Sequence, residues 1–284
     1  MQADFSISAV LSRARARLAK CSESPRLDAE MLLALALDVP RSYLLAHPED
    51  ELDEVTLARF ERSIERRLER VPIAYLTGLK EFWTLSLTVT PATLVPRPET
   101  ELLVEVALRE LPADSPSHVA DLGTGSGAIA LAIAKERPRC LVWATDASEA
   151  ALAVAAENAR QNDVANVEFL HGDWLAPLGD RRVDLLISNP PYVRSDDPVL
   201  AALRHEPKDA LASGADGLDA IRTIANAAVD HVTPEGLLLL EHGADQRADV
   251  VGILHDSGWL DVSCHDDLSG RPRAVCARRA SAAS

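Results

Sequence analysis

The sequence predicts an α/β protein with a mostly parallel sheet, preceded by a small helical domain. Three observations lead to this prediction. From about residue 119 onward, short apolar strands alternate with helices, which is the pattern of a parallel sheet covered by helices on both faces. Polar residues recur where successive strands end, and ligands of such folds bind at the carboxyl ends of the strands. Before about residue 75, apolar residues recur only at helical spacing.

The helical domain is expected to span residues 1–75. Its apolar residues recur at turn spacing in three segments, which Pro25, Pro40 and Pro48 separate. The apolar positions are Ile7, Val10, Leu11 and Leu18, then Leu27, Met31, Leu32 and Leu35, then Val55, Leu57, Phe60, Ile64 and Leu68. We expect a small bundle that recognises or positions a partner, with its many arginines on solvated helix faces.

A short β-hairpin linker is expected over residues 76–95, because Leu85–Thr90 alternates apolar and polar residues. The second domain is then expected to span residues 96–284. Its first helix begins near Pro98, since proline suits the first turn of a helix. Prolines on both sides hold Arg97 rigidly, so we expect Arg97 to line a substrate site. The alternative interpretation of the same residues is a well-capped helix start.

A glycine-rich loop follows the first strand of this domain. The strand ends at Asp121, and three alternating glycines, Gly123, Gly125 and Gly127, lead into an apolar helix. Glycines permit positive φ and let a ligand approach the backbone closely. With Ala128 the loop also fits the dinucleotide fingerprint. The close third glycine and the preceding carboxylate are more typical of S-adenosylmethionine (SAM) sites, where Asp121 can hold the ammonium end of the cofactor.

The next two strands also end in residues suited to a nucleoside. Asp146 ends the strand that begins near Cys140, and its carboxylate can accept hydrogen bonds from both ribose hydroxyls. Asp173 and Trp174 follow the third strand. Asp173 can accept from an adenine amine and Trp174 can stack on the purine. A plain loop acid and a core-edge aromatic are the alternatives for these two residues.

The most specific motif is Asn189-Pro190-Pro191-Tyr192, directly after the buried strand 183–188. Consecutive prolines remove two backbone donors and fix φ, so the loop is stiff and cannot join the sheet. Its carbonyl oxygens, the Asn189 amide and the Tyr192 ring together make a receptor for a planar NH2 group. A plain proline turn is the alternative.

The rest of the chain completes the fold. A helix over 219–232 is followed by a buried strand over 236–241, a helix over 246–257 and closing strands over 259–263 and 273–277. The polar strand ends around Asp121, Asp146, Asp173 and Asn189 are therefore expected to meet at one edge of a single sheet.

Composition favours a cytoplasmic enzyme and argues against several other classes. No signal peptide or membrane-length apolar run occurs, and the four cysteines are scattered without metal-ligand spacing. We therefore expect no metal and no membrane partner. The first 75 residues carry 11 basic and 13 acidic side chains, whereas the remainder carries 18 and 31. A domain with this excess of acidic side chains repels the phosphate backbone of a nucleic acid. This weighs against a nucleic acid as a direct partner.

Three segments make the chain similar to the protein-glutamine N5-methyltransferases, and in particular to those that modify release factors. They are Leu94–Glu101 with its Pro-Arg-Pro-Glu, Asp121–Gly127 and Asn189–Tyr192. The closing Asp267–Arg273 also resembles the ending of this family. The resemblance covers nearly the whole chain. It implies a Rossmann-like class I SAM-dependent methyltransferase with a seven-stranded, mostly parallel sheet.

The resemblance also implies the partners and the site. The substrate would be the glutamine of the Gly-Gly-Gln motif in class I peptide chain release factors, with SAM as cofactor. The implied cofactor contacts are Gly123, Thr124, Gly125, Ser126, Gly127, Asp146, Trp174 and Asn189. The substrate amide would be held by Asn189, Pro190, Pro191 and Tyr192.

The expected chemistry is direct methyl transfer to an amide nitrogen. The Asn189 side chain and the Pro190 carbonyl would accept both N–H bonds while Tyr192 stacks on the amide plane. No strong general base is evident, although His205 and His242 are available. Other hypotheses are methylation of ribosomal protein L3, methylation of an exocyclic amine in DNA or RNA with the base flipped out, and a non-catalytic cofactor-binding adaptor.

Overall fold

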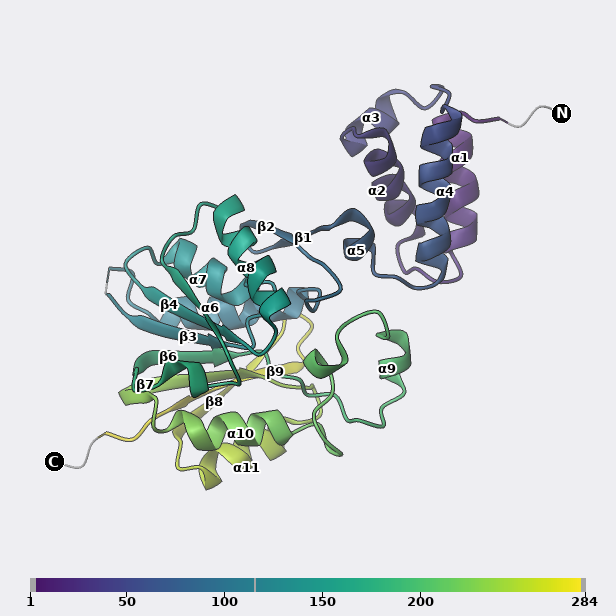
Figure 1. Ribbon diagram of the computed structural model, residues 1–284. Helices are drawn as coiled ribbons and strands as arrows, with labels where there is room; N and C mark the ends of the chain where they lie inside the picture. Colours follow the sequence, from purple (N-terminus) through teal and green to yellow (C-terminus); the bar gives the residue numbers. More distant parts are fainter. Residues whose placement is uncertain (1–3, 115, 282–284) are drawn as a thin grey trace. The chain divides into compact units, whose positions relative to one another are not determined.

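The computed structural model describes residues 4–114 and 116–281, and it divides into two compact units between Leu79 and Lys80 (Figure 1). Each unit has a hydrophobic core of its own. The second unit contains a seven-stranded, mostly parallel sheet, which confirms the predicted α/β class.

Five helices form the described part of the first unit. They are α1 (Ile7–Leu18), α2 (Pro25–Leu37), α3 (Arg41–Ala46), α4 (Glu54–Leu68) and α5 (Ile73–Thr77). The three longer helices confirm the three predicted segments. The short helices α3 and α5 were not predicted, because five or six residues carry too few apolar repeats to show a period.

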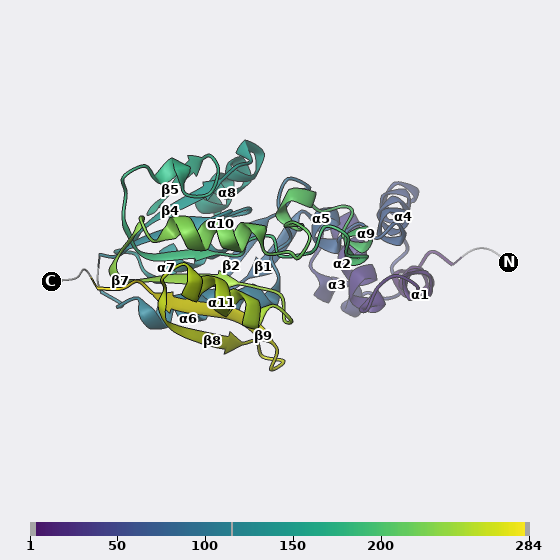
Figure 2. The ribbon, with the colours of Figure 1, turned by 90° about the horizontal axis from the view of Figure 1, so that it is seen from below.

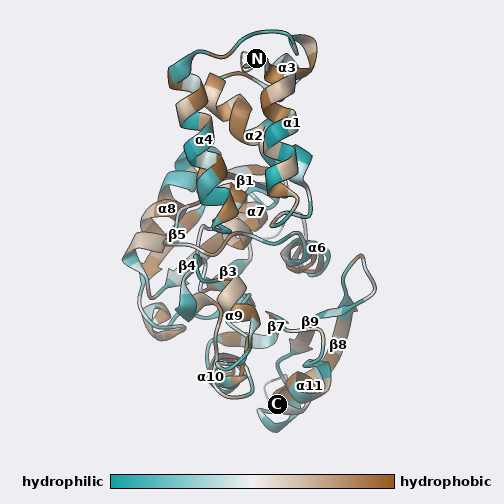
Figure 3. Cartoon of the chain, turned by 90° about the vertical axis from the view of Figure 1, so that its right-hand side faces the viewer, coloured by the Kyte–Doolittle hydropathy of each residue, from teal (hydrophilic) through white to brown (hydrophobic). Residues whose placement is uncertain are grey.

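The apolar faces of α1, α2 and α4 pack together as the core of this unit. Ile7, Leu18, Leu33, Phe60 and Ile64 are each at most 1% exposed. Figure 3 shows α4 with teal and brown bands along its length, as expected for a helix with one buried and one charged face.

Two short strands, β1 (Leu79–Phe82) and β2 (Leu85–Thr88), form a separate two-stranded sheet. The free edge of β2 is held by two asparagines, Asn158 in α8 (Glu149–Gln161) and Asn162 directly after this helix. Asn158 exchanges two hydrogen bonds with the backbone of Thr88, and Asn162 does the same with Ser86. The edge strand is therefore satisfied by side chains, not by another strand.

The large sheet has the strand order β5-β4-β3-β6-β7-β9-β8. Pairings among the first five strands in this order are parallel, and β9 is antiparallel to both of its neighbours. The strands are β3 (His118–Leu122), β4 (Leu141–Asp146), β5 (Val167–His171), β6 (Val183–Ser188), β7 (Val232–Glu241), β8 (Leu260–Asp266) and β9 (Pro272–Arg278).

Helices cover both faces of this sheet (Figures 1 and 2). One face packs against α6 (Glu101–Glu110), α7 (Ala128–Glu136) and α8. The other packs against α10 (Asp219–Ala228) and α11 (Arg247–Asp256). The four-residue helix α9 (Val199–Ala202) lies in the long connection after β6.

The predicted extent of one helix is wrong at its carboxyl end. The helix predicted over 219–232 ends at Ala228, and Val232 is already the first residue of β7. Val232 pairs with Val183 of β6, so a sheet contact across about fifty residues ends the helix early.

Candidate active site

A cavity of about 520 Å³ opens where the parallel strands β3, β4 and β6 end. Two further walls come from residues 91–94, after the β1–β2 hairpin, and from residues 207–210, after α9. Seven predicted site residues line it: Gly123, Gly125, Asp146, Asp173, Trp174, Asn189 and Pro191. The structure thus brings residues from four strand ends together at one place, as expected for ligand sites in such sheets.

The glycine loop is bent tightly against the end of β4. All three of its glycines have positive φ, between 58° and 83°. Asp146 accepts a hydrogen bond from the Gly125 amide through Oδ2 at 2.9 Å and from the Ser148 amide through Oδ1 at 2.8 Å. A Cβ at Gly125 would meet nothing within 4 Å, so the space beside this glycine is open. Gly123 and Gly125 therefore leave room for a ligand against bare backbone, whereas Gly127 packs closely against Leu131 and Ala155.

Asp121 does not line the cavity but is buried behind the loop, at 1% exposure. Its Oδ2 accepts from the Thr124 hydroxyl at 2.6 Å and from the Ala130 amide at 3.1 Å. Its Oδ1 is buried and has no hydrogen-bond partner among the residues that the structure describes. Burial raises the pKa of Asp121 to about 7, because the charged form is poorly solvated there. Three predicted residues of the loop itself are also buried and do not line the cavity, namely Thr124, Ser126 and Gly127.

Trp174 forms the aromatic part of the cavity wall. Its backbone has the unusual φ of 43°, and its carbonyl accepts from the Thr145 hydroxyl at 2.9 Å. The ring lies over the glycine loop, 3.6 Å from the position that a Cβ of Gly123 would take. The neighbouring Asp173 is exposed at the rim. Both are placed beside the loop where a flat ring could stack.

The Asn-Pro-Pro-Tyr loop leaves the sheet at the end of β6. Asn189 donates from Nδ2 to the Thr100 hydroxyl at 3.1 Å, while Pro190 is buried. Tyr192 does not line the cavity; its hydroxyl donates to Glu241 Oε1 at 3.0 Å. The carbonyl of Tyr192 accepts from the Gln246 amide at 3.0 Å. The loop is thus held at both ends, which keeps Asn189 in one place.

Arg97 forms an ion pair instead of lining the cavity. Its guanidinium lies 2.5 Å from Oε1 of Glu206, a residue only 7% exposed. The other carboxylate oxygen of Glu206 accepts from the Val95 amide at 3.0 Å. This pair joins the segment directly after residues 91–94 to the residue directly before residues 207–210, and so holds two walls of the cavity together.

Three residues of this site were not predicted, namely Thr100, Glu206 and Glu241. Thr100 lies in the segment Leu94–Glu101 but had no role assigned to it, and Glu206 and Glu241 belong to no motif. The partners of all three lie far away in sequence. One signal was available for Glu241, which ends the apolar run Leu237–Leu240 as the other site acids end their strands.

The two histidines named as available differ in their surroundings. His242 is buried, and burial lowers its pKa. His205 lies in the loop between α9 and Glu206. Among the described residues no group of three or more His, Cys, Asp or Glu side chains is arranged to hold a metal ion. None of the described helices has the length and apolar character needed to span a bilayer.

Comparison with known proteins accounts for both units. Residues 9–78 match the family model of the PrmC N-terminal domain, and residues 99–217 match that of the methyltransferase small domain. A release factor glutamine methyltransferase of Coxiella burnetii is 46% identical over 263 residues, covering 93% of this chain and 95% of that protein. The chain belongs to the release factor glutamine methyltransferase family.

Another release factor glutamine methyltransferase, from Xylella fastidiosa, is 49% identical over 255 residues, covering 89% of this chain and 93% of that protein. A methyltransferase of Pyrococcus furiosus of known structure shares the fold, with a TM-score of 0.55 at 18% identity, covering 78% of this chain and 99% of that one. The resemblance on which the family was predicted is therefore confirmed.

Proposed function

We propose that this protein transfers a methyl group from SAM to the side-chain amide nitrogen, N5, of the glutamine in the Gly-Gly-Gln motif of class I peptide chain release factors, and so modulates translation termination in the cytoplasm. One observation carries the proposal. The amide of Asn189, on a stiff loop, shares a cavity with the glycine loop and Asp146. A carboxamide receptor and a nucleoside site thus face the same space.

The residues around the glycine loop fit SAM. Asp146 keeps unused acceptor capacity after its two backbone bonds and would take the ribose hydroxyls. Trp174 offers its ring to the adenine, and Asp173 offers a carboxylate to the adenine amine. Within the described part of the chain, the buried Oδ1 of Asp121 has no hydrogen-bond partner. The ammonium group of SAM, bound beside the loop, would supply a positive charge near this carboxyl group. When bound, SAM supplies a methyl group on a sulfonium, whose departure leaves a neutral thioether.

The protein's own contribution is to orient a poor nucleophile. The lone pair of an amide nitrogen is delocalised into its carbonyl. Because Asn189 Nδ2 is engaged by Thr100, its Oδ1 is the atom left to accept an N–H of the substrate amide. The Pro190 carbonyl would accept the second N–H. These two acceptors would stabilise the positive charge that develops on the amide nitrogen during transfer. They would also hold this nitrogen in line with the methyl group. Tyr192 lies outside the cavity lining, and its hydrogen bond to Glu241 would keep the loop that carries Asn189 in place.

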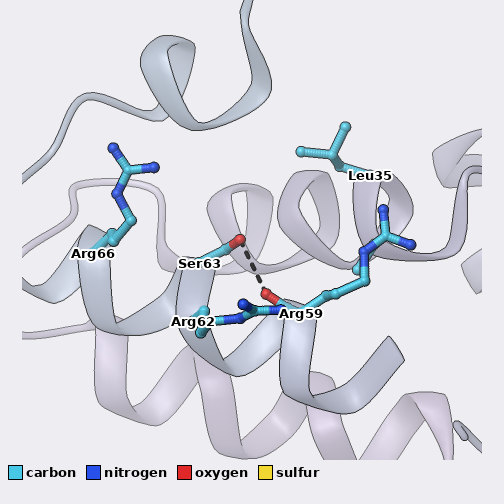
Figure 4. A pocket seen from close by; sticks show the side chains of 6 residues that line it. Leu35, Arg59, Arg62, Ser63 and Arg66 are labelled. Atoms are coloured by element: carbon cyan, nitrogen blue, oxygen red, sulfur yellow. Dashed lines mark hydrogen bonds between the residues drawn. The ribbon is translucent and has the colours of Figure 1, made fainter. Parts of the chain in front are cut away.

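We also propose that residues 1–75 form a domain that recognises the protein substrate. The surface concerned is a hollow of about 320 Å³ between α2 and α4, here called the arginine face (Figure 4). It is lined by Leu35, Ala36, Arg59, Arg62, Ser63 and Arg66. Leu35 is 44% exposed.

The arginine face has the charge and shape for an acidic partner. Arg59, Arg62 and Arg66 stand on one side of α4, and none of them forms an ion pair within the part of the chain that the structure describes. Other arginines of this unit, Arg17, Arg26, Arg41 and Arg67, are paired with carboxylates. In a chain of net charge −15, a segregated group of free cations fits an acidic segment of the substrate with an aliphatic side chain for the hollow.

Mass spectrometry of a purified release factor, incubated with the protein and SAM, tests the proposed reaction. We expect one added methyl group on the Gly-Gly-Gln peptide, and its absence with Asn189→Ala, which should still bind SAM. Ribosomal protein L3 and a DNA duplex serve as competing substrates in parallel reactions. Methylation of either of these, with none on the release factor, would overturn the assigned substrate.

A further inference from the structure

Gln246 carries a buried side-chain amide that joins three separate loops of the second unit. It directly precedes α11 and is 7% exposed. Its Nε2 donates to the carbonyl of Tyr192 at 3.0 Å and to the carbonyl of Asp216 at 3.3 Å. Its Oε1 accepts from the backbone amide of Gly243 at 2.8 Å. Both hydrogens of this amide and its oxygen are therefore engaged, each with the backbone of another loop.

These partners fix the direction and the chemistry of the Gln246 side chain. A backbone N–H only donates and a carbonyl only accepts, so Oε1 must face Gly243 while Nε2 faces the two carbonyls. A carboxylate has no hydrogen to donate, and it would place its lone pairs against two carbonyl oxygens. The position therefore calls for an amide, and a carboxylate of the same size does not fit.

A glycine packs against the same carbonyl group of Tyr192. Gly217 has a φ of +81°, a backbone conformation that favours glycine. A Cβ at this position would lie 2.3 Å from the Tyr192 carbonyl oxygen and 2.8 Å from Gln246 Nε2. Both distances are too short for a carbon atom. The missing side chain of Gly217 therefore leaves the room in which Gln246 and Tyr192 meet.

The carbonyl held in this way belongs to the Asn-Pro-Pro-Tyr loop. Asn189 and Pro191 of this loop line the cavity. Two consecutive prolines fix φ between Asn189 and Tyr192, so few backbone rotations separate these two residues. A displacement of the Tyr192 carbonyl would therefore move the Asn189 side chain and the Pro190 carbonyl, which are the two proposed acceptors of the substrate amide.

Gln246 also connects this loop to a second wall of the cavity. Directly after the Asn-Pro-Pro-Tyr loop, Val193 exchanges two hydrogen bonds of 2.9 Å with residues 211–213. Residues 211–213 follow the cavity wall at 207–210. Asp216, the second acceptor of Gln246, lies further along the same segment. One amide thus links the loop that faces the substrate with the segment that continues the opposite wall.

We propose that Gln246 is a positioning residue for methyl transfer. It holds the Tyr192 carbonyl, and Gly217 leaves room for this contact. The loop then keeps Asn189 and Pro190 where they accept the two N–H bonds of the substrate amide. Gln246 does not line the cavity, so it acts through the loop. The inference rests on the proposed function, because it assigns a task within that reaction.

Single-turnover methylation of a Gly-Gly-Gln peptide, with the protein and SAM in saturating excess, tests the inference. The rate constant measured in this way does not depend on the fraction of the protein that is folded. It therefore separates positioning from a loss of stability. We expect Gln246→Glu to lower this rate constant by at least about tenfold, while the Kd for SAM changes by less than about threefold.

Asn166→Asp is the matched control for Gln246→Glu. The Asn166 side-chain nitrogen lies 2.9 to 3.2 Å from three backbone carbonyls, so the same amide-to-acid change removes comparable bonds. Asn166 directly precedes β5, at the amino ends of the parallel strands, whereas the cavity lies at their carboxyl ends. The control should lose stability but keep the wild-type rate constant.

Gly217→Ala tests the same contact from its other side. Its Cβ would displace the Tyr192 carbonyl or Gln246, so the rate constant should fall as it does in Gln246→Glu. Gly258→Ala is the matched control, because Gly258 has a φ of +83° and a Cβ there would meet nothing within 4 Å. It carries similar backbone strain without the clash and should keep the wild-type rate constant. If one contact is involved, the double variant Gln246→Glu/Gly217→Ala loses no more than the worse single variant.

Wild-type rate constants in Gln246→Glu and Gly217→Ala would overturn the inference and leave the proposed function intact. Equal losses in the two control variants, or a fall in SAM affinity as large as the fall in rate, would also overturn it. A wild type that binds SAM but methylates no Gly-Gly-Gln glutamine would instead overturn the proposed function. Urea unfolding identifies any variant that fails to fold. If Gln246→Glu does not fold, Gln246→Met, which removes the donors without adding a charge, decides in its place.

Discussion

Two buried carboxylates of the helical unit and two of the sheet unit are held in opposite ways, while a further buried carboxylate of the sheet unit, Glu206, is paired with Arg97. In the helical unit, Asp28 pairs with Arg67 at 2.7 Å, and Glu30 pairs with Arg26 at 2.7 Å and with Arg41 at 2.6 Å. In the sheet unit, neither Asp121 nor Glu241 forms an ion pair within the described residues, and each has one carboxylate oxygen without a partner. All four carboxylates have side chains that are nearly inaccessible.

The pKa shifts follow this difference. Hydrogen bonds from Arg26 and Arg41 lower the pKa of Glu30 and so favour its charged form. Burial raises the pKa of both Asp121 and Glu241 to about 7. A buried charge that has its own cation serves the fold, whereas one without a cation is available to a ligand or to a catalytic neighbour. Both unpaired carboxylates lie in the sheet unit, which also contains the proposed active site.

Breaking a paired carboxylate should have the largest effect on stability. Arg67→Met leaves the buried carboxyl group of Asp28 without its partner, so we expect the unfolding free energy of the helical unit to fall by about 3–5 kcal/mol. Urea unfolding followed by circular dichroism measures it. Arg62→Met, on the exposed side of the same helix, is the matched control and should change it by about 0.5 kcal/mol or less. A loss below about 1 kcal/mol for Arg67→Met would contradict the comparison.

Neutralising the unpaired carboxylates should raise the unfolding free energy instead of lowering it. A pKa raised in the folded state means that the folded protein holds its protons to higher pH than the unfolded chain. These groups therefore stabilise below about pH 4 and lose that contribution as the pH rises to about 7. We expect Asp121→Asn/Glu241→Gln to be more stable than the wild type at pH 8, by up to about 3 kcal/mol per group.

The pH dependence of this gain is the decisive measurement. The stability difference between the double variant and the wild type should be near zero at pH 4 and reach its plateau above pH 7. The exposed Asp180→Asn serves as the control and should show no such difference. A gain that does not depend on pH would mean that packing, not ionisation, causes it.

The cofactor side of the sheet unit gives an effect of intermediate size. Asp146→Ala removes two bonds to the loop backbone and the proposed ribose acceptor, so we expect SAM affinity to fall by about 10- to 100-fold. Isothermal titration with SAM measures it. Asn189→Ala should change the same affinity by less than about threefold. Unchanged SAM affinity in Asp146→Ala would remove the ribose assignment.

The arginine face should give the smallest effect. Replacing Arg59, Arg62 and Arg66 with alanine should raise KM for intact release factor about three- to tenfold at low salt, and less at high salt. KM for a short Gly-Gly-Gln peptide should stay unchanged, because the peptide carries no distant segment. Arg15, Lys20 and Arg139, also exposed, make a charge-matched triple control. Equal effects of both triple variants would show that only net charge matters.

Much of this protein follows from the sequence alone. The period of apolar residues distinguishes helices from strands, and polar residues at the ends of consecutive strands predict one shared edge. Gly123, Asp146, Trp174 and Asn189 were placed in this way, and all four line the cavity. Such positions are predictable because each depends on its own strand and turn, and a parallel sheet brings the strand ends together.

The tertiary structure decided the connections between these positions. Asn189 meets Thr100 across 89 residues of chain, and Arg97 meets Glu206 across 109. Neither pair leaves a local pattern, because the contacts depend on the order in which β3, β6 and β7 join the sheet. The same reason hid Glu241. Its apolar strand was predicted, but only the packing of β7 beside β6 places its carboxylate behind Tyr192, buried and without a cation.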